Sequence, residues 1–164
     1  MKTAVYPGTF DPMTYGHLDI IKRAANIFEH VIVAVLDNKE KTPLFSVSER
    51  VNILKEETKD IPNVSVESFG GLLSDYCKMK DIHVVVRGLR AVTDFEYELQ
   101  MSQMNRKLSG NELDTVFFNT SLKYSYLSSS AVKQIAEFHG DLSAFVPDWV
   151  ANELYAKYGF GRTL

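Results

Sequence analysis

The sequence predicts an α/β fold: a Rossmann-like, doubly wound sheet of five parallel strands with helices on both faces and extra C-terminal helices. Two observations support this prediction. Short apolar segments rich in β-branched residues alternate along the chain with segments of helical period. Most of the apolar segments also lack the apolar–polar alternation of a half-exposed strand. That pattern is typical of strands buried on both faces of a parallel sheet.

The expected strands are short, and each is rich in the residue types that pack well on a pleated surface. They cover residues 3–6, 31–36, 64–66, 84–86 and 115–118. In a sheet of this kind, ligands bind outside the carboxyl ends of the strands, where loops enter the helices. The sequence therefore directs the search for function to the residues that follow each strand.

Helices are expected between the strands because apolar residues recur there at helical spacing. One apolar face contains Leu18, Ile21, Ala25 and Phe28, and another contains Val47, Val51 and Leu54. Residues 46–49 and 93–96 have the form of capping boxes, which predicts helix starts at both places. Two more helices are expected, one from Ser128 or Ser129 to Phe138 and one from Pro147, as first helical residue, to Tyr158.

The composition indicates one globular domain spanning residues 1–164. The hydrophobic share is 45% and the charged share 24%, both ordinary for a soluble protein. A net charge of -3 argues against nucleic acid or a membrane surface as partner. The longest apolar run, residues 31–36, is far shorter than the roughly 20 residues of a membrane span. The single cysteine, Cys77, suits a packed helix position in a reducing, cytoplasmic setting.

The loop after the first strand is the strongest candidate for a phosphate site. Gly8 and Gly16 allow close approach of the backbone, Thr9 offers a hydroxyl, and His17 falls in the first turn of the following helix. Free amides and the helix dipole favour a phosphate at that place. The alternative, a plain turn with a helix-capping histidine, is equally compatible with these residues taken alone.

Further polar residues follow the other strands. Arg87 and Arg90 follow the fourth strand, where guanidinium groups match phosphate oxygens. Lys41 follows the second strand, with Lys39 as a competing candidate and solvated loop charge as the alternative. The serines at 128–130 open a helix, where hydroxyls and free amides are available to an anion. The alternative is that one serine is merely the N-cap.

Other titratable residues have simpler interpretations. Asp94 and Glu96 are expected to be first-turn helix charges, whereas Glu98 is expected to face a ligand. For the remaining histidines, His30, His83 and His139, a structural role is expected.

Three motifs together closely resemble the bacterial phosphopantetheine adenylyltransferases. They are YPGTFDPxTxGH at residues 6–17, RGLRAxxDFEYE at residues 87–98 and YLSSS at residues 126–130. The element Thr14-Tyr15-Gly16-His17 matches the (T/H)xGH signature of the wider nucleotidyltransferase superfamily. The resemblance extends over nearly the whole chain.

The resemblance implies transfer of AMP from ATP to 4'-phosphopantetheine, giving dephospho-coenzyme A and pyrophosphate, the penultimate step of coenzyme A synthesis. The acceptor attacks the α-phosphorus in line, without a covalent enzyme intermediate. Mg²⁺ arrives with ATP, and no all-protein metal site is expected. The family also implies a homohexamer and competition by coenzyme A.

Carried over by motif position, the resemblance assigns a role to each candidate. His17 stabilises the transition state, and Lys41, chosen over Lys39 by Pro43 and Phe45, acts with Thr9 on the reacting phosphates. Arg90, Ser129 and Ser130 hold the departing pyrophosphate. Phosphopantetheine contacts Thr9, Lys41, Leu73, Arg87 and Asn105. The ATP site comprises Thr9, Phe10, His17, Gly88, Leu89, Arg90, Glu98, Tyr124, Ser125, Tyr126, Leu127, Ser128, Ser129 and Ser130.

Three other functions remain as alternatives. A nicotinate or nicotinamide mononucleotide adenylyltransferase shares the first loop, but its serine-rich helix start typically continues to an arginine where this chain has Lys133. A nucleotide-binding sensor without catalysis explains a phosphate cleft but not the convergence of basic groups on it. A nicotinamide dehydrogenase is the weakest alternative, because no GxGxxG follows the first strand.

Overall fold

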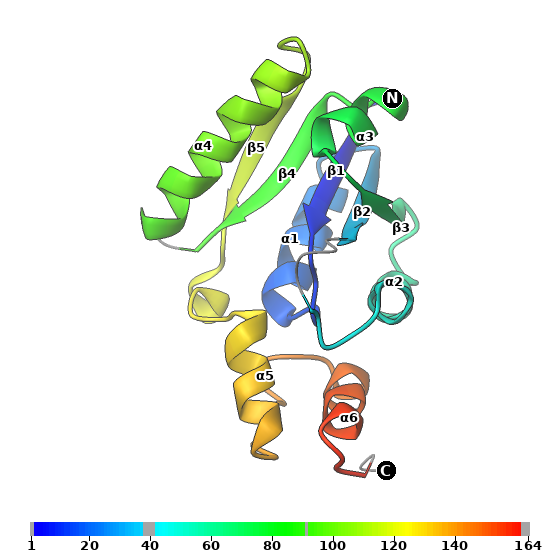
Figure 1. Ribbon diagram of the computed structural model, residues 1–164, viewed down its shortest axis with the longest axis vertical. Coiled ribbons are helices and arrows are strands. Elements are labelled where there is room, and N and C mark those ends of the chain that lie inside the picture. Colours follow the sequence, from blue (N-terminus) through cyan, green and yellow to red (C-terminus); the bar gives the residue numbers. More distant parts are fainter. Residues whose placement is uncertain (1, 38–41, 91, 162–164) are drawn as a thin grey trace.

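The computed structural model describes residues 2–37, 42–90 and 92–161. Strands and α-helices alternate from the N-terminus up to the last strand, and a 3-10 helix and two α-helices follow (Figure 1). The elements are β1 (Thr3–Gly8), α1 (Tyr15–Ala25), β2 (His30–Asp37), α2 (Val47–Thr58), β3 (Val64–Gly70), α3 (Leu73–Met79), β4 (Val84–Leu89), α4 (Val92–Leu108), β5 (Asp114–Asn119), the 3-10 helix η1 (Leu122–Tyr124), α5 (Ser129–Glu137) and α6 (Asp148–Lys157).

The strands form one five-stranded sheet in the order β3-β2-β1-β4-β5, and every pairing is parallel. The predicted parallel, doubly wound sheet is thereby confirmed. After β1 the chain builds outward through β2 and β3, then returns to place β4 on the other side of β1. The order therefore reverses between β1 and β4, and a crevice opens there at the carboxyl ends of the strands.

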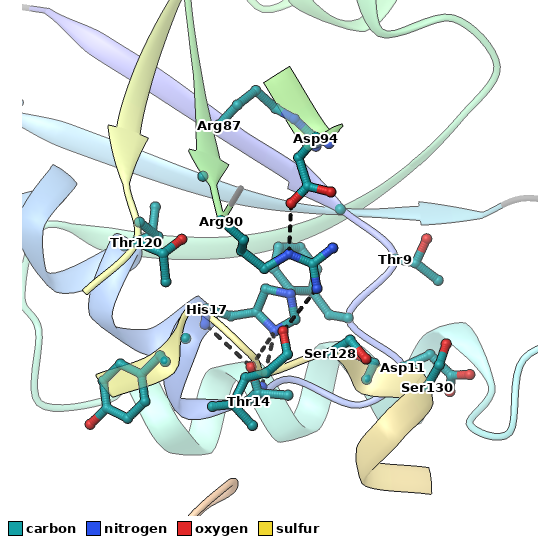
Figure 2. A pocket seen from close by; sticks show the side chains of 18 of the residues that line it. Thr9, Asp11, Thr14, His17, Arg87, Arg90, Asp94, Thr120, Ser128 and Ser130 are labelled. Atoms are coloured by element: carbon teal, nitrogen blue, oxygen red, sulfur yellow. Dashed lines mark hydrogen bonds and ion pairs between the residues drawn. The ribbon is translucent and has the colours of Figure 1, made fainter. Parts of the chain in front are cut away.

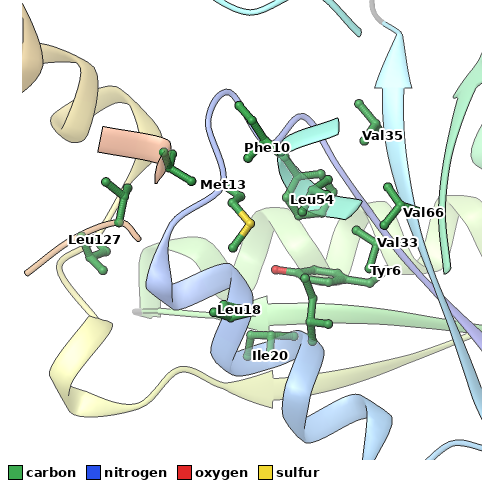
Figure 3. Close-up of a cluster of buried hydrophobic side chains, with 14 of the residues drawn as sticks. Tyr6, Phe10, Met13, Leu18, Ile20, Val33, Val35, Leu54, Val66 and Leu127 are labelled. Atoms are coloured by element: carbon green, nitrogen blue, oxygen red, sulfur yellow. The ribbon is translucent and has the colours of Figure 1, made fainter. Parts of the chain in front are cut away.

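Side chains of the central strands pack alternately on the two faces of the sheet, as the pleat requires. Tyr6 and Val33 belong to a large cluster that also includes residues of α1, α2, α5 and α6 (Figure 3). Val5 and Ile32 belong to a second cluster completed by α3. The absence of polar alternation in these strands thus reflects burial on both sides.

The helix starts agree with the capping signals in part. Ser46 and Glu49 form the predicted capping box of α2. Ser128 caps α5 by accepting the amide of Ala131. Thr93 lies inside the first turn of α4, not at its N-cap, and Pro147 caps α6 instead of opening it.

Several element ends differ from the sequence-based expectation; β3, for example, runs to Gly70 and not only to residue 66. Phe28 lies beyond α1, which ends at Ala25, although its buried ring still joins the core. β4 continues to Leu89 because β5 pairs with it over its full length, including Gly88 with Phe118. Arg87 therefore lies within a strand and not after one. Within the described ranges, no helix is both long and apolar enough to cross a membrane.

Candidate active site

A cavity of about 600 Å³ opens at the carboxyl ends of β1 and β4 (Figure 2). Its walls come from the loop after β1, the start of α1, the end of β4, α4, the loop after β5 and the start of α5. Most of the candidate residues lie on these walls: Thr9, Phe10, His17, Arg87, Gly88, Arg90, Glu98, Tyr124, Leu127, Ser128, Ser129 and Ser130. The structure thus gathers them around one cavity at the point where the strand order reverses.

His17 occupies the third position of α1 and closes a capping box with Thr14. The main-chain N–H of Thr14 donates to His17 Nδ1 at 3.0 Å, and the Thr14 hydroxyl accepts the amide of His17. A main-chain N–H can only donate, so Nδ1 must be the acceptor. In the neutral ring the proton therefore resides on Nε2, where it can be donated to a ligand.

The environment of His17 keeps its ring uncharged. Burial, followed by the charges of Arg90 and Arg87, lowers the pKa of His17 to about 4. Burial likewise raises the pKa of the Tyr6 phenol to about 12. Both groups are therefore neutral near pH 7, and His17 can act as a hydrogen-bond donor but not as a cation. The capping role expected as the alternative is observed, and the ring also lines the cavity, so the two roles are compatible, but the phosphate contact stays a prediction.

The first loop is shaped by an internal aromatic contact. Phe10 is 3% exposed, has a left-handed φ of 50°, and packs edge-on against His17 at 5.1 Å between ring centroids. A Cβ atom at Gly8 would lie 2.9 Å from the Phe10 ring. The glycine is therefore needed to admit this ring, a reason different from the close ligand approach expected from sequence.

Arg87 is held by a carboxylate from α4. Its Nε and Nη2 donate to the two carboxylate oxygens of Glu98 at 2.7 and 2.5 Å, and its Nη1 donates to the Pro7 carbonyl at 2.7 Å. Burial disfavours the charged guanidinium, but the hydrogen bonds and charge of Glu98 outweigh it, so the pKa of Arg87 lies above its usual range. Glu98, expected to face a ligand, lines the cavity with both oxygens engaged.

Arg90 is held in a similar but more exposed pair. Its Nε donates to Asp94 at 3.0 Å, and its Nη1 donates to the Leu127 carbonyl at 2.8 Å. Figure 2 shows its guanidinium between Asp94 and the His17 ring. Asp94 thus has a role that its position in a first helical turn did not reveal.

The three serines at the start of α5 are not equivalent. Ser128 caps the helix, and the Ser129 hydroxyl donates to the Pro12 carbonyl at 2.7 Å. Ser130 is exposed beside them on the cavity wall. One serine is therefore a cap, one ties α5 to the first loop, and one faces the cavity edge.

Asp11 and Lys133 were not singled out from the sequence as a site pair, although both line the cavity. Lys133 Nζ lies 2.8 Å from Asp11 Oδ2, across 122 positions of sequence. Lys133 follows Ser129 and Ser130 by four and three residues, which puts it on their side of the helix. That spacing is the signal that could have identified the lysine.

The charges on the described part of the cavity wall are balanced. Arg87, Arg90 and Lys133 pair with Glu98, Asp94 and Asp11, respectively. Each cation is thereby oriented, but its charge is already matched. An incoming polyphosphate must compete with these carboxylates or bring its own counter-ion.

Several candidates lie away from this wall or outside the described residues. Leu73 packs, half-buried, against the second core cluster. Leu89, Asn105, Ser125 and Tyr126 also do not line the cavity. Lys41 falls outside the described residues, although Thr42 and Pro43 after it line the cavity.

No cluster of three or more histidine, cysteine or acidic residues suited to a metal occurs in the part of the chain that the structure describes. Cys77 is buried in α3, and burial raises the pKa of its thiol to about 11. The thiol is therefore packed, as expected, and too weakly acidic to act as a nucleophile at neutral pH.

The family model described as cytidylyltransferase-like matches residues 5–135. A phosphopantetheine adenylyltransferase of Caldanaerobacter subterraneus is 58% identical over 96% of this chain and 98% of the relative. Another, of Lachnoclostridium phytofermentans, is 54% identical over 99% of both chains. The chain belongs to the phosphopantetheine adenylyltransferase family. The resemblance inferred from the three motifs is thus confirmed.

A solved structure from Vibrio parahaemolyticus, described as a nicotinate-nucleotide adenylyltransferase, is similar to this family member in fold. The TM-score is 0.69, the sequence identity 16%, and the match covers 100% of this chain and 98% of that one. At that identity the likeness concerns the fold alone. It confirms the predicted Rossmann-like nucleotidyltransferase architecture.

Proposed function

We propose that this family member transfers AMP from ATP to 4'-phosphopantetheine, giving dephospho-coenzyme A and pyrophosphate, in the penultimate step of coenzyme A synthesis. The assignment of the family from relatives at 52–58% identity supports this reaction. The observation in the structure that carries it is His17, a neutral, half-buried donor at the head of α1 beside two oriented arginines. Such an arrangement suits charge building up on a phosphoryl group.

The proposed transfer is direct. The acceptor phosphate attacks the α-phosphorus in line, and the enzyme contributes position and charge stabilisation. Thr14 lies near His17, but the imidazole Nδ1 already accepts the Thr14 amide and the hydroxyl accepts a main-chain N–H in the cap. The threonine is also 2% exposed. This pair is therefore poorly suited to act as an activated nucleophile.

We place the reacting groups around His17. Thr9, Lys41 and Arg87 are proposed to contact the acceptor phosphate or the α-phosphate, and Arg90, Ser129 and Ser130 the leaving pyrophosphate. The proposed ATP contacts are the remaining predicted residues of the first loop, the end of β4, Glu98 and residues 124–130. Leu73 and Asn105 stay assigned to the pantetheine arm.

Mg²⁺ is proposed to enter with ATP as part of the substrate. The balanced pairs on the described wall leave little net positive charge for a triphosphate. A cation carried on the β- and γ-phosphates supplies the positive charge that the wall lacks, without a protein metal site. The role of the side chains is then to contact phosphate oxygens.

The proposed function is tested by following pyrophosphate release from MgATP with each acceptor in turn. Release with 4'-phosphopantetheine, and far slower release with nicotinate or nicotinamide mononucleotide, is expected. Release with a mononucleotide alone would assign the chain to the rival acceptor. Binding of ATP with no release for any acceptor would instead support a nucleotide sensor.

We further propose that the chain self-associates, as a homohexamer, in the cytoplasm. α4 and the edge strand β5 expose the apolar side chains of Phe95, Leu99, Met104, Leu108 and Val116. An exposed apolar band of this kind suits an interface. Sedimentation should give six times the 18.6 kDa chain mass, and Met104→Lys should lower it.

Coenzyme A is proposed as a competing ligand, because it shares the pantetheine arm and the adenylate with the reaction's substrates. It should raise the KM for phosphopantetheine without lowering kcat at saturating acceptor.

A further inference from the structure

Arg50 is a buried cation that the assigned site does not use. It lies in the first turn of α2, is 2% exposed, and donates to main-chain carbonyls of three separate segments. Burial lowers the pKa of the guanidinium, and the charges of Asp11 and Asp37 oppose that shift. Placing a charged group in the core is costly, so the geometry that it enforces requires an explanation.

Of the three residues whose carbonyls Arg50 contacts, Thr9 lines the cavity and Phe45 lies two residues after Pro43, which also lines it. Nη1 donates to Thr9 O at 2.7 Å and to Leu36 O at 3.1 Å, and Nε donates to Phe45 O at 3.1 Å. Thr9 belongs to the loop after β1, Leu36 is the last but one residue of β2, and Phe45 precedes α2. One planar group thus joins the loop after β1 to both stems of the loop after β2.

Asp11 completes the same connection from the opposite direction. Its carboxylate, 4% exposed, accepts the amides of Leu44 and Phe45, each at 2.9 Å. Phe45 is therefore held at its N–H by one loop and at its C=O by Arg50. Its ring is 1% exposed, which fixes the residue by packing as well.

We propose that Arg50, together with Asp11, is a positioning residue for adenylyl transfer. It sets the segment around Thr42 and Pro43 relative to Thr9, and all three residues line the cavity. Both segments carry groups to which the proposed function gives roles on the reacting phosphates, and the inference rests on that function. Among the described residues, the hydrogen bonds of Arg50 go to main-chain oxygens, so it acts through these segments and not on substrate.

The planar fork of arginine, and not its charge, does the positioning. A lysine keeps the charge but supplies a single nitrogen, which cannot reach carbonyls that diverge from one another. Arg50→Lys therefore separates the two contributions. Ile53→Val is the matched control, because Ile53 is equally buried on the same helix and contacts the core.

The test combines kinetics with amide exchange. Arg50→Lys is expected to lower kcat for pyrophosphate release at least tenfold, with the Kd for MgATP changed less than threefold. Amides of residues 44 and 45 should exchange faster, while those of β4 keep the wild-type rate. Ile53→Val should retain kcat within twofold. Arg50→Met should be at least as impaired as the lysine variant, and Asp11→Asn should shift the same quantities in the same direction.

A kcat for Arg50→Lys within twofold of wild type overturns the proposal. So does a loss of activity matched by Ile53→Val, or faster exchange spread evenly over the chain. If Arg50→Met does not fold, the Arg50→Lys and Asp11→Asn arms still decide the outcome. If the wild-type protein itself releases no pyrophosphate with phosphopantetheine, the proposed function fails. The exchange at residues 44 and 45 then decides the positioning claim separately.

Discussion

The wall of the cleft built from the start of α1 presents the neutral ring of His17, whereas the wall built from β4 and α4 presents cations held by carboxylates. On the first wall, His17 is kept uncharged by burial and oriented by its helix cap. On the second, Glu98 and Asp94 fix the guanidinium groups of Arg87 and Arg90. Contacts within the protein thus orient the side chains of both walls.

This difference separates two tasks. A neutral donor gains most where charge develops during the reaction, and it adds little to binding a substrate that is already charged. Oriented cations attract charged substrates in the ground state as well. Substitutions on the first wall should therefore act on turnover, and substitutions on the second wall on substrate affinity.

The largest expected effect comes from the neutral wall. His17→Ala should lower kcat about 1000-fold, the scale for losing one donor to a developing charge, while the Kd for MgATP stays within about threefold. It also removes the imidazole's half of the capping box, a hydrogen bond worth about 1 kcal/mol, while Thr14 still caps the helix, so assays belong well below the melting temperature. Rapid-quench turnover and calorimetric titration measure the two quantities. His139→Ala, which changes a ring stacked on Phe160, is the control. Lost ATP affinity with unchanged kcat would break the distinction between the walls.

The next effect comes from the charged wall. Arg87→Ala should weaken acceptor binding about 10- to 100-fold and lower the free energy of unfolding by about 3 kcal/mol, because Glu98 is left buried without its partner. The double variant Arg87→Ala with Glu98→Gln should recover much of the stability but none of the affinity. Chemical denaturation and acceptor KM values test this. Recovery of both quantities would show that Arg87 acts only on the fold.

The neutral wall also predicts a pH dependence of stability. Because the pKa of His17 is about 4 when folded and near 6.5 when unfolded, the unfolded chain binds the extra proton between these values. The free energy of unfolding should fall as pH decreases from about 6.5 to about 4, by at most about 1.4 kcal/mol per pH unit from this group. His17→Gln keeps a capping-box residue and should lack this component. Equal slopes for both proteins would contradict a neutral His17.

The smallest expected effect comes from the exposed pair. Asp94→Asn should change the ATP KM less than about threefold and stability by less than about 1 kcal/mol, since both side chains are partly in water. Steady-state kinetics at low and high salt measure the difference. A change as large as that of Arg87→Ala would mean that the two arginine pairs are equivalent.

Local patterns in the sequence predict the frame of the cleft. Buried strands such as residues 31–36 lack polar alternation, so the parallel sheet and its covered faces could be predicted. The loop after β1 and the place of His17 in a first helical turn follow from the same reasoning. These features depend on residues close together in the chain.

The connections that orient the site could not be predicted in this way. Arg87 in β4 donates to Glu98 in α4, eleven residues later in the sequence. Residues eleven apart do not contact each other within one helix or one strand, so the sequence pattern does not predict this pair. Arg50 reaches Thr9 across 41 positions, and Asp11 reaches Lys133 across 122. Such pairs depend on how the elements pack. From its residue type and position alone, Asp94 is predicted to be a first-turn helix charge, and its ion pair with Arg90 is not predicted.

The central claim, direct transfer to the acceptor in a cleft that supplies only position and charge stabilisation, is tested most directly by stereochemistry. ATP made chiral at its α-phosphorus with sulfur and an oxygen isotope should give dephospho-coenzyme A with inverted configuration after one turnover, as one in-line displacement requires. Retention of configuration would mean two displacements, and hence a covalent enzyme intermediate that contradicts this account.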